Sequence, residues 1–68
     1  MNQAILKPRQ RFIKAVADHG ITFEDLAGIT GIPLIDLYRC AAGRLDLSRR
    51  REELLAKVLE QKSLDLFD

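Results

Sequence analysis

The chain is poor in the residues with which small domains cross-link themselves. Its 68 residues include one cysteine and one histidine. One cysteine cannot form an internal disulfide, and one cysteine with one histidine cannot supply the four ligands of a structural zinc site. A chain this short buries only about 60% of the surface that its unfolded state exposes, so it depends on a tightly packed core, a partner subunit, or both. We expect one domain over residues 1–68 and no metal ion.

Long apolar runs and a leader-like N-terminus are also missing. No run approaches the ~20 apolar residues that span a bilayer, and the first residues, MNQAILKPRQR, lack the basic-then-apolar order of a secretory signal. The unpaired thiol of Cys40 suits a reducing compartment. We therefore expect a cytoplasmic protein with no membrane association. Hydrophobic residues make up 47% of the chain and charged residues 31%, which indicates a folded domain rather than a disordered chain.

The net charge is close to zero, at +1, but the charges are distributed unevenly. Residues 1–19 contain four cations and one anion, and residues 44–51 also contain four cations and one anion. Residues 52–68 are net negative. A basic patch built from two separated segments, with acid elsewhere, is the electrostatic pattern of a DNA-binding domain. The alternative is the ordinary solvated surface of a helix.

Apolar spacing and end signals predict an all-α fold of four to five helices. No stretch alternates with period two, so no sheet is expected. Thr22 and Asp25 have the spacing of a capping box, Ser48 can cap a later helix, and glycines follow the helix ends. The predicted helices cover residues 8–18, 23–30, 33–42 and 49–61, with one more turn around 64–67. The residues expected to face inward are Phe12, Ile13, Val16, Ala17, Leu26, Ala27, Ile29, Leu37, Cys40, Ala41, Leu54, Leu55, Val58 and Leu59.

The connection between the second and third predicted helices is the most specific feature. It is one or two residues long, around Gly31 and Ile32, and so short a connection makes the helices cross steeply, at about 90–120°. This crossing requires a small residue where the helices touch, and Ala27 supplies it. The turn also requires a residue that tolerates positive φ, and Gly31 supplies it. Residues 23–42 are therefore predicted to form a helix-turn-helix.

On these residues the chain resembles a known family. The segment ITFEDLAGITGIPLIDLYRCAAGR is similar to the helix-turn-helix of the lambda repressor/Cro-like proteins, also called the XRE family, and LSRRREELLAKVLE is similar to the family's fourth helix. The family's threonine cap, Leu-Ala pair, Gly-aliphatic turn and helix-ending glycine are matched by Thr22, Leu26, Ala27, Gly31, Ile32 and Gly43. The resemblance implies a five-helix domain, a third helix in the major groove, and dimers on two-fold operators.

Two departures from the family pattern bear on how DNA is contacted. Phe23 stands where the family commonly has a glutamine that contacts a phosphate, and the third helix opens, after a proline, with Leu34, Ile35 and Asp36 in place of polar residues. Leu34 and Ile35 cannot hydrogen-bond a base, so they either pack on thymine methyl groups or bury against a partner protein. Asp36 can accept from a cytosine amino group, exclude wrong sequences, or pair with Arg39.

The candidate DNA contacts form two groups. Residues on or just after the third helix are predicted to reach bases or the groove: Leu34, Ile35, Asp36, Tyr38, Arg39 and Arg44. Residues at two helix N-termini and near the N-terminal arm (residues 1–7) are predicted to contact phosphates: Thr22, Phe23, Ser48, Arg49, Arg50, Arg9 and Arg11. Arginines at a helix N-terminus oppose the helix dipole, and a bound phosphate offsets that cost. The alternative is local neutralisation by Glu52 and Glu53.

The C-terminal tail, residues 63–68, is more apolar than a solvated tail requires. Leu64, Leu66 and Phe67 are predicted to form a dimer contact, because a small domain gains stability from a partner and two half-sites increase specificity. The alternative is that these side chains fold back on the core.

Together these features predict a sequence-specific DNA-binding transcriptional regulator. We expect a dimeric repressor or autoregulator on a palindromic operator, in a bacterial or phage-infected cell. The expected partners are double-stranded DNA and a second copy of the chain, with no cofactor and no small-molecule effector. Alternatives are a protein-binding helix-turn-helix module, such as an antirepressor or recombination directionality factor, and an antitoxin-type regulator. An enzyme is not expected, because the sequence offers no paired carboxylates, phosphate loop or metal-ligand set.

Overall fold

Helices account for most of the chain that the structure describes. The computed structural model describes residues 7–67, and within them it contains five helices and no strand, which confirms the all-α class. The helices are α1 (Gln10–His19), α2 (Phe23–Thr30), α3 (Leu34–Ala41), α4 (Arg49–Leu59) and α5 (Ser63–Phe67). Residues 1–6, which are most of the predicted arm, and residue 68 lie outside the described residues. In the described range no helix is long and apolar enough to cross a membrane.

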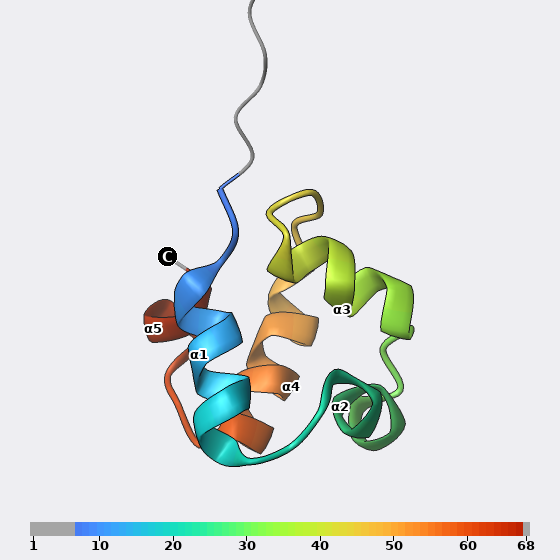
Figure 1. Cartoon of the computed structure of the whole chain (residues 1–68), viewed down its shortest axis with the longest axis vertical. Helices are drawn as coiled ribbons and strands as arrows, with labels where there is room; N and C mark the ends of the chain where they lie inside the picture. The colour runs from blue at the N-terminus through green and yellow to red at the C-terminus, as the bar shows by residue number, and fades with distance from the viewer. Residues whose placement is uncertain (1–6, 68) are drawn as a thin grey trace, which may run out of the picture.

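The helices form two pairs, and α4 packs against both of them. Figure 1 shows α1 and α5 on one side of α4, and α2 and α3 on the other. Within each pair the helices contact each other, and α4 contacts both pairs. This arrangement leaves one side of α3 facing away from the rest of the molecule.

Side chains from all five helices meet in one core. The buried apolar residues are Phe12, Val16, Leu26, Ile32, Leu37, Cys40, Ala41, Leu47, Leu55, Ala56, Leu59 and Leu66. Three of the predicted inward positions are wrong, because Ala17, Ile29 and Leu54 are exposed. Successive helical residues are rotated by about 100°, so an apolar residue next to the buried stripe can fall outside it. In α4 the burial of Leu55 and Leu59 turns Leu54 toward solvent.

The helix starts follow the predicted capping chemistry. At the start of α2 the Asp25 N–H donates to Thr22 Oγ1 at 3.0 Å, and the Thr22 N–H donates to Asp25 Oδ2 at 3.1 Å. This reciprocal pair confirms the capping box. At the start of α4 the Arg51 N–H donates to Ser48 Oγ at 3.3 Å, which confirms Ser48 as a cap.

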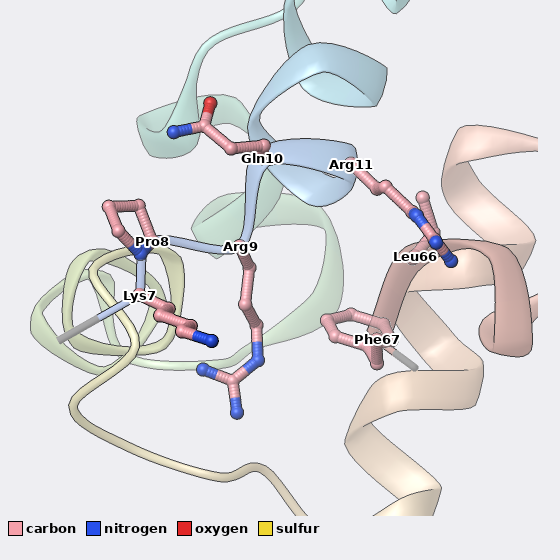
Figure 2. A pocket seen from close by; sticks show the side chains of 7 residues that line it. All are labelled: Lys7, Pro8, Arg9, Gln10, Arg11, Leu66 and Phe67. Carbon is pink, nitrogen blue, oxygen red and sulfur yellow. The ribbon is translucent and has the colours of Figure 1, made fainter. Parts of the chain in front are cut away.

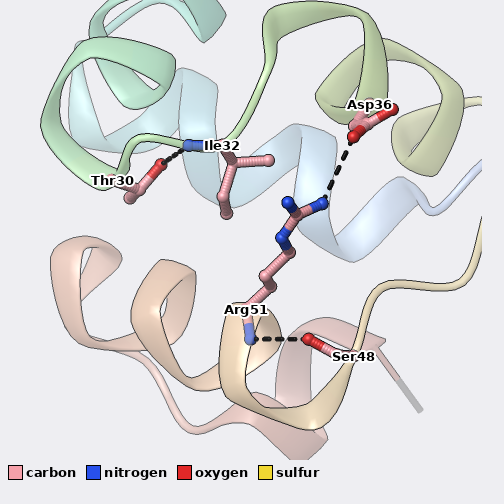
Figure 3. Close-up of polar contacts among 5 residues, drawn as sticks. All are labelled: Thr30, Ile32, Asp36, Ser48 and Arg51. Atoms are coloured by element: carbon pink, nitrogen blue, oxygen red, sulfur yellow. Dashed lines mark hydrogen bonds and ion pairs between the residues drawn. The ribbon is translucent and has the colours of Figure 1, made fainter.

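A three-residue turn, residues 31–33, joins α2 to α3 and is slightly longer than predicted. Gly31 has φ 78°, in the left-handed region that glycine adopts without strain. The Thr30 hydroxyl donates to the Leu26 carbonyl at 2.7 Å. It also accepts from the Ile32 N–H at 3.2 Å (Figure 3). Ile32 is only 2% exposed and fills the wedge between the two helices. The turn therefore fixes α3 relative to the core.

The C-terminal helix α5 folds back on α1. Leu66 is 3% exposed, and the ring of Phe67 lies 5.2 Å from that of Phe12 between centroids. Leu66 therefore belongs to the core and not to a surface that a second copy can reach, which corrects the predicted dimer contact at this residue. Phe67 is half-buried, and Leu64 remains 63% exposed.

Candidate nucleic-acid interface

Exposed side chains of mixed chemistry follow one face of α3. Ile35 is 56% exposed and Tyr38 45%, and Arg39 is also exposed. Residues three and four positions apart lie on the same face of a helix, so these three side chains form one stripe. Leu34 is half-buried, and Leu37 on the opposite face is fully buried. We call Ile35, Tyr38 and Arg39 the α3 stripe.

The only acid on α3 is neutralised by a residue of α4. Arg51 Nη1 lies 3.2 Å from Asp36 Oδ2, and the Asp36 side chain is 25% exposed (Figure 3). The pairing with Arg39 considered from the sequence does not form. Arg51 is 15 positions away, and no local spacing signals this partner. The ion pair joins α3 to the start of α4 and compensates the one carboxylate beside the stripe.

A row of aromatic rings supports Tyr38 from the core side. Tyr38, Phe23, Phe12 and Phe67 follow one another with centroid distances of 5.3, 5.8 and 5.2 Å. Phe23 is half-buried within this row. Its ring therefore packs between Phe12 and Tyr38 and does not extend toward a phosphate, which corrects the sequence prediction for its side chain. Offset and edge-on rings at these separations attract one another, so the row holds the Tyr38 ring in place.

A Schellman motif ends α3 and brings Arg44 next to Arg39. The Arg44 N–H donates to the Arg39 carbonyl at 2.8 Å, and the Gly43 N–H donates to the Cys40 carbonyl at 3.0 Å. Gly43 has φ 81°, as the motif requires. The backbone of Lys7 lies against this turn, since a Cβ on Gly43 would overlap the Lys7 carbonyl oxygen. Lys7 thus lies beside the turn that links Arg39 to Arg44.

Arg9, predicted to contact phosphate, is held by its own chain. Its N–H donates to the Ala41 carbonyl at 2.8 Å, and its guanidinium donates to the Cys40 carbonyl at 2.9 Å and pairs with Asp46. The side chain is only 19% exposed. Arg9 therefore clamps the N-terminal segment onto the C-terminal end of α3, where its charge also suits the helix dipole. Because of these contacts α1 begins at Gln10, later than predicted.

Arg11 lies beside α5 rather than α3. Figure 2 shows Arg9 and Arg11 on opposite sides of a pocket that is also lined by Leu66 and Phe67. The Arg11 side chain extends toward Leu66 in this view. The structure therefore does not bring Arg11 together with the α3 stripe, and its predicted phosphate contact lies on another side of the molecule.

At the start of α4, one arginine lies near a carboxylate and the next does not. Arg49 Nη1 is 4.0 Å from Glu53 Oε2, with side chains 84% and 61% exposed, and so exposed a pair is weak. Arg50 is exposed and has no such partner among residues 7–67. The hydroxyls of Thr22 and Ser48 accept the cap hydrogen bonds, and each O–H can still donate to a phosphate.

Three arginines are available to an anion. Within residues 7–67 the guanidinium groups of Arg39, Arg44 and Arg50 make neither an ion pair nor a side-chain hydrogen bond. Arg39 and Arg44 adjoin at the end of α3, and Arg50 precedes the residue that contacts Asp36. We call these three the open arginines. Guanidinium groups suit phosphate and guanine because they present donors in a planar fork.

Cys40 belongs to the packing and not to the site. Its side chain is fully buried, and burial raises the pKa of the thiol despite the opposing charge of Arg9. A thiol that stays protonated is a poor nucleophile and acts as a small apolar residue. In the described part of the chain, no three His, Cys, Asp or Glu side chains are placed to hold a metal ion.

Comparison with known proteins gave no match to a family model, to a curated protein or to a solved structure. The likeness to the lambda repressor/Cro-like proteins therefore depends on the motif residues alone.

Proposed function

We propose that the protein is a sequence-specific DNA-binding transcriptional regulator that places the α3 stripe in the major groove of its operator. The observation that carries this proposal is the position of the open arginines. They lie at the end of α3 and the start of α4, while Asp36, the only acid of α3, is already neutralised. A helix that presents cations without uncompensated acid is suited to a phosphate-lined groove.

The dimensions of α3 agree with this role. An α-helix with its side chains is about 10–12 Å across, and the major groove, about 12 Å wide, admits one such helix. Tyr38 and Arg39 then reach base edges or the adjoining backbone, and Arg44 and Arg50 contact phosphates on either side. Phosphate contacts fix the register of the helix, and the stripe reads the sequence.

The regulator acts as a dimeric repressor or autoregulator on a palindromic operator. Two copies on two half-sites multiply specificity, and half-site spacing follows from the two-fold symmetry. Leu64 is the apolar side chain of the C-terminal segment that is left exposed for a second copy, at 63%. Arg49 and Arg50 add charge at each half-site.

The test is a titration of the purified protein against duplex DNA from the region upstream of its own gene, at about 50 and 200 mM salt. The variant is Arg39→Ala/Arg44→Ala. The matched control is Lys57→Ala/Lys62→Ala, which removes the same charge from exposed positions at the end of α4. Random duplex of equal length measures non-specific binding.

We expect the wild type and the control to protect a two-fold site with steep salt dependence. The Arg39→Ala/Arg44→Ala variant should lose the site and reduce the slope of log affinity against log salt by about one to two. If both double variants weaken binding equally, only net charge matters and the proposal of a reading helix fails.

The second candidate function is a protein-binding module. It is favoured by the exposure of two isoleucines, Ile29 on α2 at 62% and Ile35 on α3 at 56%. Absence of any preference for the upstream duplex over random DNA would support it. Capture of a partner by the wild type but not by Ile29→Asp or Ile35→Asp would then identify the docking residues.

A further inference from the structure

The two apolar residues that open α3 differ in their surroundings. Leu34 is half-buried, whereas Ile35 is 56% exposed. Ile35 also shares the stripe with Tyr38 and Arg39, three and four positions further along. The apolar side chain offered outward by α3 is therefore that of Ile35, and it lies beside the side chains that the proposed function assigns to DNA.

The polar neighbours of Ile35 do not compete with it for contact with DNA. Its neighbour Asp36 is turned toward α4 and held by Arg51 at 3.2 Å (Figure 3). The charge of the carboxylate is therefore compensated by Arg51, and the group is directed toward α4. Tyr38 is fixed by its contact with Phe23, 5.3 Å between ring centroids. In the first turn of α3, Ile35 is therefore the exposed side chain that can contact DNA directly.

An isoleucine in the major groove has one apolar group to contact. Base edges there present hydrogen-bond donors and acceptors, and the exception is the C5-methyl group of thymine. Water that covers an exposed isoleucine and an exposed methyl is released when the two pack together. We infer, on the basis of the proposed function, that Ile35 is a specificity residue that selects thymine by its methyl group in each operator half-site.

The test replaces each thymine of the bound site by deoxyuridine, one symmetric pair at a time. This change removes only the methyl group and leaves every hydrogen-bonding group of the base pair. The proteins are the wild type, Ile35→Ala, and Ile29→Ala as a control that removes a similarly exposed isoleucine from α2. Circular dichroism of each variant establishes that the fold is kept.

We expect the methyl groups of one symmetric pair of thymines to contribute to binding affinity. Loss of a buried methyl weakens binding by about fourfold, and by roughly 15-fold for both half-sites together. Wild type and Ile29→Ala should both show this loss, and Ile35→Ala should bind the thymine and uracil sites equally. A double-mutant cycle of this kind assigns the methyl to one side chain.

Two results would overturn the inference in distinguishable ways. If the wild type binds its operator but no thymine methyl matters, or if Ile35→Ala keeps the full uracil penalty, Ile35 does not read thymine while operator binding stands. If the wild type has no preferred DNA site, the proposed function fails as well, and Ile35 belongs to a protein-docking surface.

Discussion

Two residues with left-handed backbone end the helices that border the proposed interface. Gly43 ends α3 with φ 81°, and Glu60 ends α4 with φ 57° through the same pair of turn hydrogen bonds. Glycine adopts this region freely, whereas a side chain adds a steric cost of about 1–2 kcal/mol. The two positions therefore differ in strain although their hydrogen bonding is alike.

Replacing Glu60 by glycine should stabilise the domain. Glu60→Gly removes the steric cost and loses part of the gain to the larger entropy of the unfolded chain, so the free energy of unfolding should rise by about 0.5–1 kcal/mol. Urea unfolding followed by circular dichroism measures it. Glu60→Ala keeps a Cβ at positive φ and should show no such gain. An equal gain in both variants would mean that removal of charge is the cause.

Replacing Gly43 by alanine should have the opposite effect. The new Cβ would be strained by φ and would also overlap the Lys7 carbonyl, so Gly43→Ala should lower the free energy of unfolding by about 2 kcal/mol or more. Gly31→Ala is the control, because φ is similar at 78° but no atom lies within 4 Å of the new Cβ. Gly31→Ala should lower the free energy of unfolding by about 1 kcal/mol. Equal losses measured by the same unfolding experiment would remove the Lys7 contact from the explanation.

At the scale of the helices, α3 is positioned by contacts at both of its ends. The capped turn from α2 and the Asp36–Arg51 pair hold its start, and Arg9 and the Schellman motif hold its end. The capping box, the turn glycine and the buried face of α3 were predicted from local spacing, because these features depend on neighbours within four residues. The ion-pair partners of Arg9 and Asp36 were not predicted. Arg9 pairs with a residue 37 positions away and Asp36 with one 15 positions away, and such pairs depend on how the helices pack.

The Asp36–Arg51 pair leads to a prediction about binding. Arg51→Ala should cost about 1 kcal/mol of stability, because the pair is only partly buried. It should also weaken operator binding by about tenfold, because the freed carboxylate then repels nearby phosphates. Asp36→Asn/Arg51→Ala removes that charge and should restore most of the affinity. If the double variant binds as weakly as Arg51→Ala, Arg51 itself contacts DNA. Fluorescence anisotropy with labelled operator measures all three proteins.

At the scale of the whole molecule, one core spans all five helices and α5 closes it. The sequence predicted that the apolar tail pairs with a second copy, with folding back on the core as the alternative. Hydropathy alone could not decide this, since both outcomes bury the same side chains. In the structure the two leucines of the tail differ: Leu66 lies in the core, and Leu64 is exposed.

This separation predicts different effects for the two leucines. Leu66→Ala should lower the free energy of unfolding by about 2–4 kcal/mol, because it leaves a cavity in the core. Leu64→Ala should change it by less than about 0.5 kcal/mol at low protein concentration. If Leu64 contacts a second copy, its variant should instead raise the dimer dissociation constant, measured by analytical ultracentrifugation. A large loss of stability in dilute Leu64→Ala would place that side chain in the core.

The aromatic row has an optical consequence. The chain contains one tyrosine and no tryptophan, and that tyrosine is Tyr38, 45% exposed on the α3 stripe and in tilted contact with the Phe23 ring. Intrinsic fluorescence of the unlabelled protein therefore arises at the surface proposed to meet DNA. Its intensity, corrected for absorption by the nucleic acid, reports docking of α3 at the point of contact, without a label or an added reporter residue.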